Sequence, residues 1–83
     1  MLYIVSKAPS AESVSLLPTN SDFKNDVSVV LVQDGVRHQQ LPFPHVFTLS
    51  DDILSRKLPS PFPLVSYQDL LHMIFEAETV AIL

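Results

Sequence analysis

Short runs of apolar, β-forming residues recur along this chain, and each is apolar at consecutive positions rather than at alternate ones. Strands of that kind are buried on both faces, which is typical of a parallel sheet covered by helices. Helix signals separate the runs, and this order favours right-handed βαβ units. The sequence therefore predicts one α/β domain over residues 1–83, with a mainly parallel sheet of four to five strands flanked by short helices. The predicted strands are residues 2–5, 27–32, 45–49, 63–65 and 79–83.

Serines mark the starts of three predicted helices. Ser10 precedes a helix over residues 11–17, Ser50 precedes one over residues 51–57, and Ser66 forms a capping box with Asp69 before the last helix. In that last helix one stripe is apolar and the other side is largely polar; the two sets are Tyr67, Leu70, Leu71 and Ile74, and Gln68, Asp69, His72 and Glu76. Residues 33–44 hold the only glycine and a Pro-Phe-Pro segment, so we expect at most one turn of helix there.

The composition excludes several classes of protein. The chain has no cysteine, so it has no disulfide, no thiolate metal ligand and no cysteine nucleophile. Small secreted domains usually need such cross-links, so we expect a cytoplasmic location. No apolar stretch approaches the roughly 20 residues of a membrane span, and we expect no membrane association. The formal net charge of −4 argues against direct binding of nucleic acid.

No group of residues forms a recognisable catalytic, metal-binding or cofactor-binding motif. The single Gly35 cannot build a glycine-rich phosphate loop, and the three histidines lack the local spacing of metal ligands. The adjacent Asp51 and Asp52 fit the first turn of a helix better than an acid–base pair. We therefore expect no enzymatic activity, and an enzyme acting through Asp34 and a histidine is the least favoured class.

Two features leave alternatives open. Asp34 follows the carboxyl end of a predicted strand, where open α/β sheets bind ligands, but Asp-Gly is also common in turns, and we favour the turn. Phe43 and Phe62 lie in proline-flanked loops, and each either fills the edge of its own core or anchors a partner. His72 is expected on the surface, facing solvent or a partner.

Four segments together resemble the DsrH/TusB family, whose members are small subunits of the DsrE-type sulfur-relay superfamily. The segments are residues 1–9, 29–36, 46–56 and 65–71, and the strand followed by Gln33-Asp34-Gly35-Val36 is the most specific of them. The resemblance implies a DsrE-like fold and assembly with DsrE/DsrF-like (TusD/TusC-like) sister subunits. Such complexes pass persulfide sulfur toward 2-thiolation of the tRNA wobble uridine or toward dissimilatory sulfur oxidation.

The family's thiol chemistry does not carry over to this chain. The persulfide carrier of the tRNA pathway is a cysteine on a sister subunit. Some DsrH-type members also have a cysteine in their first helix. In this chain, Val14 or an adjacent residue occupies the corresponding position. The resemblance therefore implies a non-catalytic subunit that supports sister subunits carrying the reactive cysteine. Residues 35–44 and the last helix are the expected contact segments, with Gly35, Val36, Arg37, His38, Phe43 and His72 as partner-contact residues. The alternative is a stand-alone homo-oligomeric binding or regulatory module that has lost sulfur transfer and associates with itself.

Overall fold

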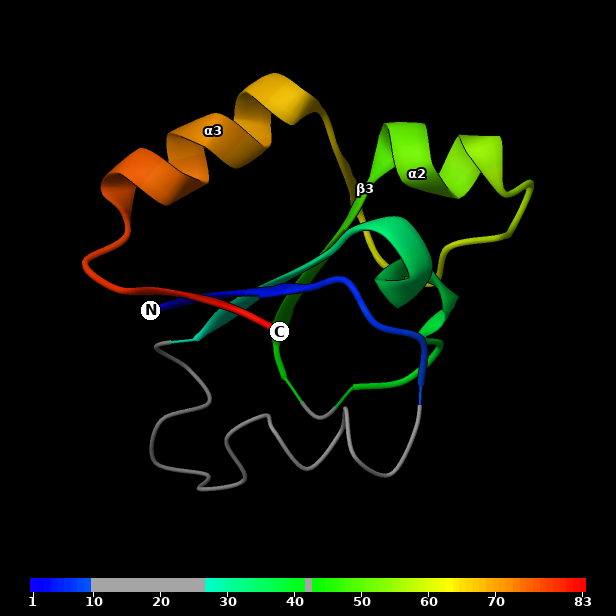
Figure 1. Cartoon of the computed structure of the whole chain (residues 1–83), viewed down its shortest axis with the longest axis horizontal. Coiled ribbons are helices and arrows are strands. Elements are labelled where there is room, and N and C mark those ends of the chain that lie inside the picture. Colours follow the sequence, from blue (N-terminus) through cyan, green and yellow to red (C-terminus); the bar gives the residue numbers. More distant parts are fainter. Residues whose placement is uncertain (10–26, 42) are drawn as a thin grey trace.

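The computed structural model describes residues 1–9, 27–41 and 43–83, and in this part of the chain the architecture is a five-stranded, all-parallel sheet flanked by short helices (Figure 1). The strand order is β4-β3-β2-β1-β5. The predicted fold class is therefore confirmed. The elements are β1 (Leu2–Val5), β2 (Ser28–Leu31), the 3-10 helix η2 (Gln33–Arg37), β3 (His45–Leu49), α2 (Ser50–Ser55), β4 (Leu64–Val65), α3 (Tyr67–Glu76) and β5 (Val80–Ile82).

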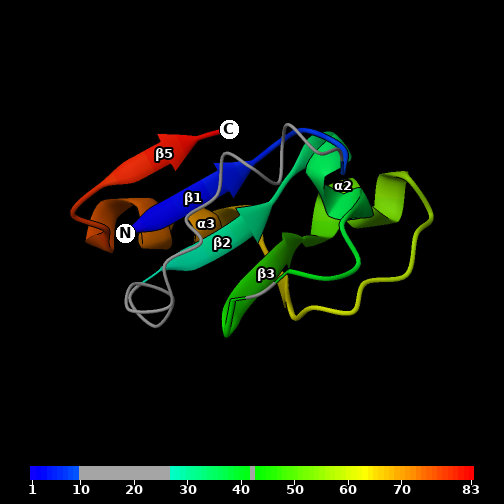
Figure 2. The same cartoon turned by 90° about the horizontal axis from the view of Figure 1, so that it is seen from below.

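The strand order determines which face of the sheet each helix covers. From β1 to β4 the chain steps across the sheet in one direction, and from β4 to β5 it crosses back to the other side of β1. Right-handed crossovers then place η2 and α2 on one face and α3 on the opposite face. In the view of Figure 2, α3 accordingly lies behind β1 and β2.

Each face of the sheet has its own apolar cluster, because successive strand residues point to opposite sides. On the side of η2 and α2, Val36 and Ile53 pack with alternate residues of the strands, which include Val5, Val29 and Leu31. On the opposite side, Leu70 of α3 packs with Leu2, Ile4, Val30 and Leu49. The central strand β2 is apolar on both faces, as the consecutive apolar pattern predicts.

The predicted strands are confirmed, with ends that differ by at most one residue. The capping box of α3 is also confirmed: the Ser66 hydroxyl accepts from the Asp69 N–H at 3.1 Å, and the Asp69 carboxylate accepts from the Ser66 N–H at 3.2 Å. The helix expected over residues 11–17 lies outside the described residues.

The expected start of α2 is wrong. Ser50 is the first helical residue, so Leu49 occupies the N-cap position. The leucine side chain cannot form a capping hydrogen bond to the first turn of α2. The reason is that β3 runs into α2 with no residue between them, so no position is left for a capping serine. The helix ends at Ser55, so Arg56 and Lys57 follow its last turn rather than lying in it, and Lys57 has a left-handed backbone with φ of 53°.

No helix in the described part of the chain has the length and apolar character needed to cross a membrane.

The two serines provide a matched pair of stability measurements. Ser66→Ala removes a cap from α3 and is expected to lower the free energy of unfolding by about 1 kcal/mol. Ser50→Ala makes the same chemical change at a position that caps nothing, and its effect should be less than half as large. Urea unfolding followed by circular dichroism checks both, and equal losses would contradict the assigned helix starts.

Candidate functional site

The carboxyl ends of β1, β2 and β3 meet at one edge of the sheet, and two short helices begin there. Gln33, the first residue of η2, lies two positions beyond the last residue of β2, and α2 follows β3 directly. This edge is where open α/β sheets place their ligand sites. A functional centre is therefore expected at this edge.

Gly35 allows η2 to approach the end of β1 closely. A Cβ atom built on Gly35 would overlap the carbonyl oxygen of Val5 and lie 2.8 Å from its carbonyl carbon. The glycine is thus required for space and not for a left-handed backbone, because its φ is not positive. Asp34 and Gly35 both lie within η2, whose five residues make it slightly longer than the single turn expected.

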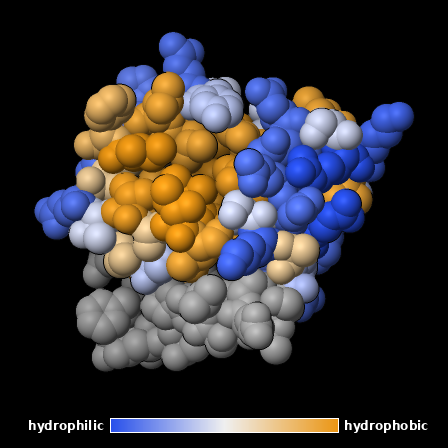
Figure 3. All heavy atoms as spheres, in the orientation of Figure 1, coloured by the Kyte–Doolittle hydropathy of each residue, from blue (hydrophilic) through white to orange (hydrophobic). Residues whose placement is uncertain are grey.

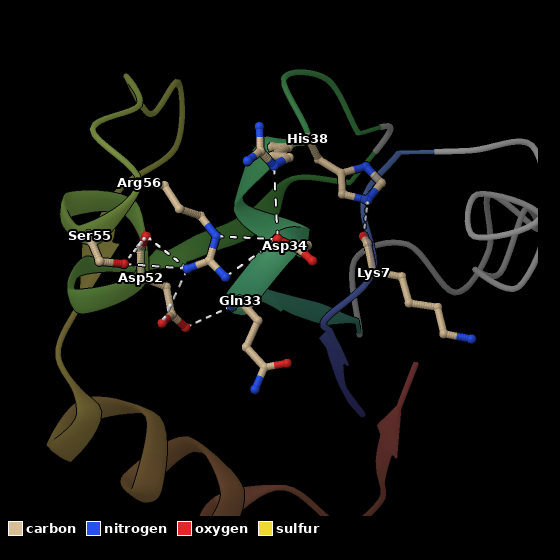
Figure 4. A network of polar contacts seen from close by, with 8 residues as sticks. Lys7, Gln33, Asp34, His38, Asp52, Ser55 and Arg56 are labelled. Carbon is tan, nitrogen blue, oxygen red and sulfur yellow. Dashed lines mark hydrogen bonds and ion pairs between the residues drawn. The ribbon is translucent and has the colours of Figure 1, made fainter.

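A polar network joins η2 to α2 at this edge (Figure 4). The Gln33 N–H donates to Oδ2 of Asp52 at 2.7 Å, although Gln33 has a left-handed φ of 49°. Nε of Arg56 lies 3.4 Å from Oδ1 of Asp34, and its Nη1 lies 3.8 Å from Oδ1 of Asp52. Nε of Arg37 approaches the same Asp34 oxygen at 3.9 Å.

The network is better suited to holding two helices together than to proton transfer. Each carboxylate faces at least one guanidinium group, so its charge already has a partner within the protein. Asp34 is 60% exposed, so its ion pairs add little stability individually. The bond from the Gln33 N–H to Asp52 joins η2 to α2, together with the Arg56–Asp34 ion pair and the packing of Val36 with Ile53.

His38 is directed away from this network. Its side chain is buried, and its Nε2 lies 3.2 Å from the carbonyl oxygen of Lys7 (Figure 4). Asp34, by contrast, faces Arg56 and Arg37. The structure therefore places Asp34 and His38 in separate interactions, and it does not bring them together as an acid–base pair.

The residues expected to contact a partner fall into two groups. Four are buried in the protein's own core or close against it: Gly35, Val36, His38 and Phe43. Phe43 packs in the cluster on the η2 side, and Phe62 is partly buried against the same cluster, so the core-filling alternative describes both rings. Arg37 and His72 are exposed, and contact through them stays a prediction.

A set of residues on α3 was not recognised from the sequence as an exposed surface. Tyr67, Leu71 and Phe75 are spaced four residues apart and are 61%, 46% and 85% exposed. They form a second apolar stripe beside the stripe that packs on the sheet through Leu70 and Ile74. The four-residue spacing is the signal that could have revealed it, because one helix bore more apolar residues than a single buried stripe requires.

The edge strand β5 extends this apolar surface. Ile82 pairs in register with Ile4, so both side chains point to the side of α3, but Ile82 is 75% exposed. Figure 3 shows a broad apolar area over α3 and the neighbouring strands. We call the surface formed by Tyr67, Leu71, Phe75 and Ile82 the α3 face.

A groove of about 370 Å³ lies between α3 and the carboxyl edge of the sheet. Its apolar lining includes Ile4 and Leu49 of the sheet, and Tyr67 and Leu71 of the α3 face contribute to it. Asp52 also lines the groove, but its carboxylate is already engaged by Gln33 and Arg56. The groove is therefore suited to apolar contact rather than to recognition of a charged group.

No cluster of three or more potential metal ligands occurs among residues 1–9, 27–41 and 43–83.

Comparison with known proteins supports the fold and goes no further. No family model matches the sequence, and no match was found among curated proteins. Among solved structures, the chain is similar to the solution NMR structure of protein Tm0979 from Thermotoga maritima, with a TM-score of 0.69 and 23% identity. The match covers 95% of this chain and 97% of that one, and it supports the small α/β fold.

The close approach of η2 to β1 gives a test of the role of Gly35. Gly35→Ala is expected to lower the free energy of unfolding by about 1–3 kcal/mol, because η2 must move away from the Val5 carbonyl to admit a methyl group. Gln40→Ala, at an exposed position in the same connection, is the control and should have little effect. Denaturant unfolding of both variants checks this, and a Gly35→Ala variant as stable as the control would contradict the packing.

Proposed function

We propose that this chain is a non-catalytic subunit of a cytoplasmic sulfur-relay complex of the DsrH/TusB type. In this proposal it binds DsrE/DsrF-like sister subunits and supports the one that carries the reactive cysteine. The pathway served is 2-thiolation of the tRNA wobble uridine or dissimilatory sulfur oxidation. The chain contributes apolar contact area and no chemistry of its own.

The observation that carries the proposal is the exposed α3 face in a chain that has no thiol. An exposed surface with several large apolar side chains on one helix and its neighbouring strand is typical of a protein–protein interface. Without cysteine, the chain cannot hold a persulfide. A member of a sulfur-relay complex with this composition acts by contact.

Two further observations support the same proposal. The order of the four segments that resemble the DsrH/TusB family is preserved along the chain, and the parallel sheet has the architecture that the resemblance implies. The arginine–aspartate network pairs charges that a hydrolytic or acid–base site would leave available. These features favour a binding subunit over an enzyme.

Deletion of the gene in its native host tests the proposed function. We expect loss of 2-thiouridine from the wobble position, measured by mass spectrometry of tRNA hydrolysates, or loss of sulfur oxidation with thiolation intact. The tagged chain should also co-purify with a DsrE-like subunit that contains cysteine.

The same experiment has an outcome that overturns the proposal. If both sulfur readouts are unchanged and the native chain is found only with copies of itself, the chain is the stand-alone homo-oligomeric module instead. Complementation with the unaltered gene is the control for effects on neighbouring genes.

A further inference from the structure

The groove beside α3 lies where the connections between strands change sides of the sheet. The chain that leaves the carboxyl end of β3 forms α2 on one face, and the chain that leaves β4 forms α3 on the opposite face. Helices that part in this way leave a crevice outside the ends of the two strands, and open α/β sheets bind their ligands in that crevice. The lining of the groove reaches both sides of it, from Leu49 and Asp52 at the end of β3 to Tyr67 at the start of α3.

The size and lining of the groove fit a small organic molecule. Its volume of about 370 Å³ lies in the lower part of the range that small-molecule sites occupy. Tyr67 contributes an aromatic ring that is 61% exposed and can pack against a flat ligand. The aliphatic part of the lining consists of Ile4, Val32, Leu49, Leu70, Leu71 and Ile74.

Gln33 supplies this groove with a polar group that the described part of the protein does not use. Its φ of 49° is a left-handed conformation that residues other than glycine rarely adopt. The backbone N–H bonds to Asp52, while the side chain extends from η2 toward α3 (Figure 4). No hydrogen bond within the described part of the chain engages the side-chain amide. The wall of the groove therefore presents a donor and an acceptor side by side.

The charges around the groove favour a neutral ligand. Asp52 carries the only formal charge among the described residues that line it, and this carboxylate accepts from the Gln33 N–H and faces Nη1 of Arg56 at 3.8 Å. Arg56 is shared with Asp34 and does not itself line the groove. An anionic ligand would therefore lose water without gaining a cation from the lining, which is costly.

We propose that this groove binds a neutral aromatic molecule that carries a carboxamide or lactam group. The ring packs among the aliphatic side chains and against Tyr67, and the amide edge of the ligand pairs with the side-chain amide of Gln33. Two amides that meet in this way satisfy one donor and one acceptor on each side. The site is only partly shared with the proposed subunit contact: Tyr67 and Leu71 belong to both, whereas Phe75 and Ile82 do not line the groove.

Titration with three small aromatic probes tests the site. Benzamide, acetophenone and benzoate share a phenyl ring, and they differ in offering a donor with an acceptor, an acceptor alone, or an anion. We expect benzamide to bind the full-length chain with a dissociation constant on the order of 1 mM, and benzoate at least about fivefold more weakly, with acetophenone between them. Changes in the amide NMR spectrum should concentrate at Gln33, Tyr67 and Leu71.

Matched variants separate the amide contact from the apolar packing. Gln33→Met keeps the backbone hydrogen bond to Asp52 but removes the amide, so it should weaken benzamide by about fivefold and abolish its advantage over acetophenone. Gln40→Met, at an exposed position, is the control and should change neither affinity. Leu71→Ser should weaken both neutral probes, whereas Phe75→Ser on the same helix should weaken neither. Unaltered thermal unfolding confirms that each variant is folded.

Three results would overturn the inference. They are the absence of benzamide binding at about 10 mM, equal affinity for benzamide and benzoate, and a loss with Phe75→Ser as large as that with Leu71→Ser. The first would leave the groove to a side chain of a protein partner, and the last would assign the probes to the α3 face. Because the titration uses the isolated chain, failure here is distinguishable from failure of the gene-deletion experiment.

Discussion

A parallel sheet has two apolar faces that both need cover, and in this chain the order of the strands decides how the helices are shared between them. The crossover from β4 back to β5 sends α3 alone, among the described helices, to one side. Of residues 1–9, 27–41 and 43–83, only the ten-residue α3 forms a helix on that side of the five-stranded sheet. Ile82 of the edge strand β5 and the outer stripe of α3 are consequently left exposed. The α3 face is thus a consequence of the topology.

On the opposite side of the sheet, η2 and α2 are held against the strands and against each other. There η2 lies against the end of β1, at a distance that only glycine permits at position 35, and its first N–H is held by Asp52 of α2. Arg56 adds contacts to Asp34 and Asp52 across the same junction. The polar residues at the carboxyl edge are therefore used to fix the helices in place.

The strands could be predicted from the sequence because each run is apolar at consecutive positions, and β2 is buried on both sides as that pattern requires. The cap of α3 could be predicted because Ser66 and Asp69 form a local motif with a local hydrogen-bond pattern. The start of α2 could not, because it depends on β3 continuing to Leu49 without a break. The burial of His38 and Phe43 depends on how the connection after η2 folds back, which no local pattern reports.

The exposed stripe on α3 shows the same limit for function. Sequence reasoning grouped Tyr67 and Leu71 with Leu70 and Ile74, whereas the structure divides them between a buried stripe and an exposed one. Helical periodicity shows which part of the circumference of α3 is apolar. How much of that apolar part is buried depends on the sheet beneath the helix, which the sequence of the helix does not report. The surface with the strongest indication of binding is therefore a tertiary property.

The central claim is that the α3 face is covered by a partner in the assembled state. Hydroxyl-radical footprinting of the chain, isolated alone and in its native assembly, measures this directly. The account predicts that oxidation of Tyr67 and Phe75 falls several-fold in the assembly while that of Leu54 is unchanged. Equal oxidation of Tyr67 and Phe75 in both states would contradict it.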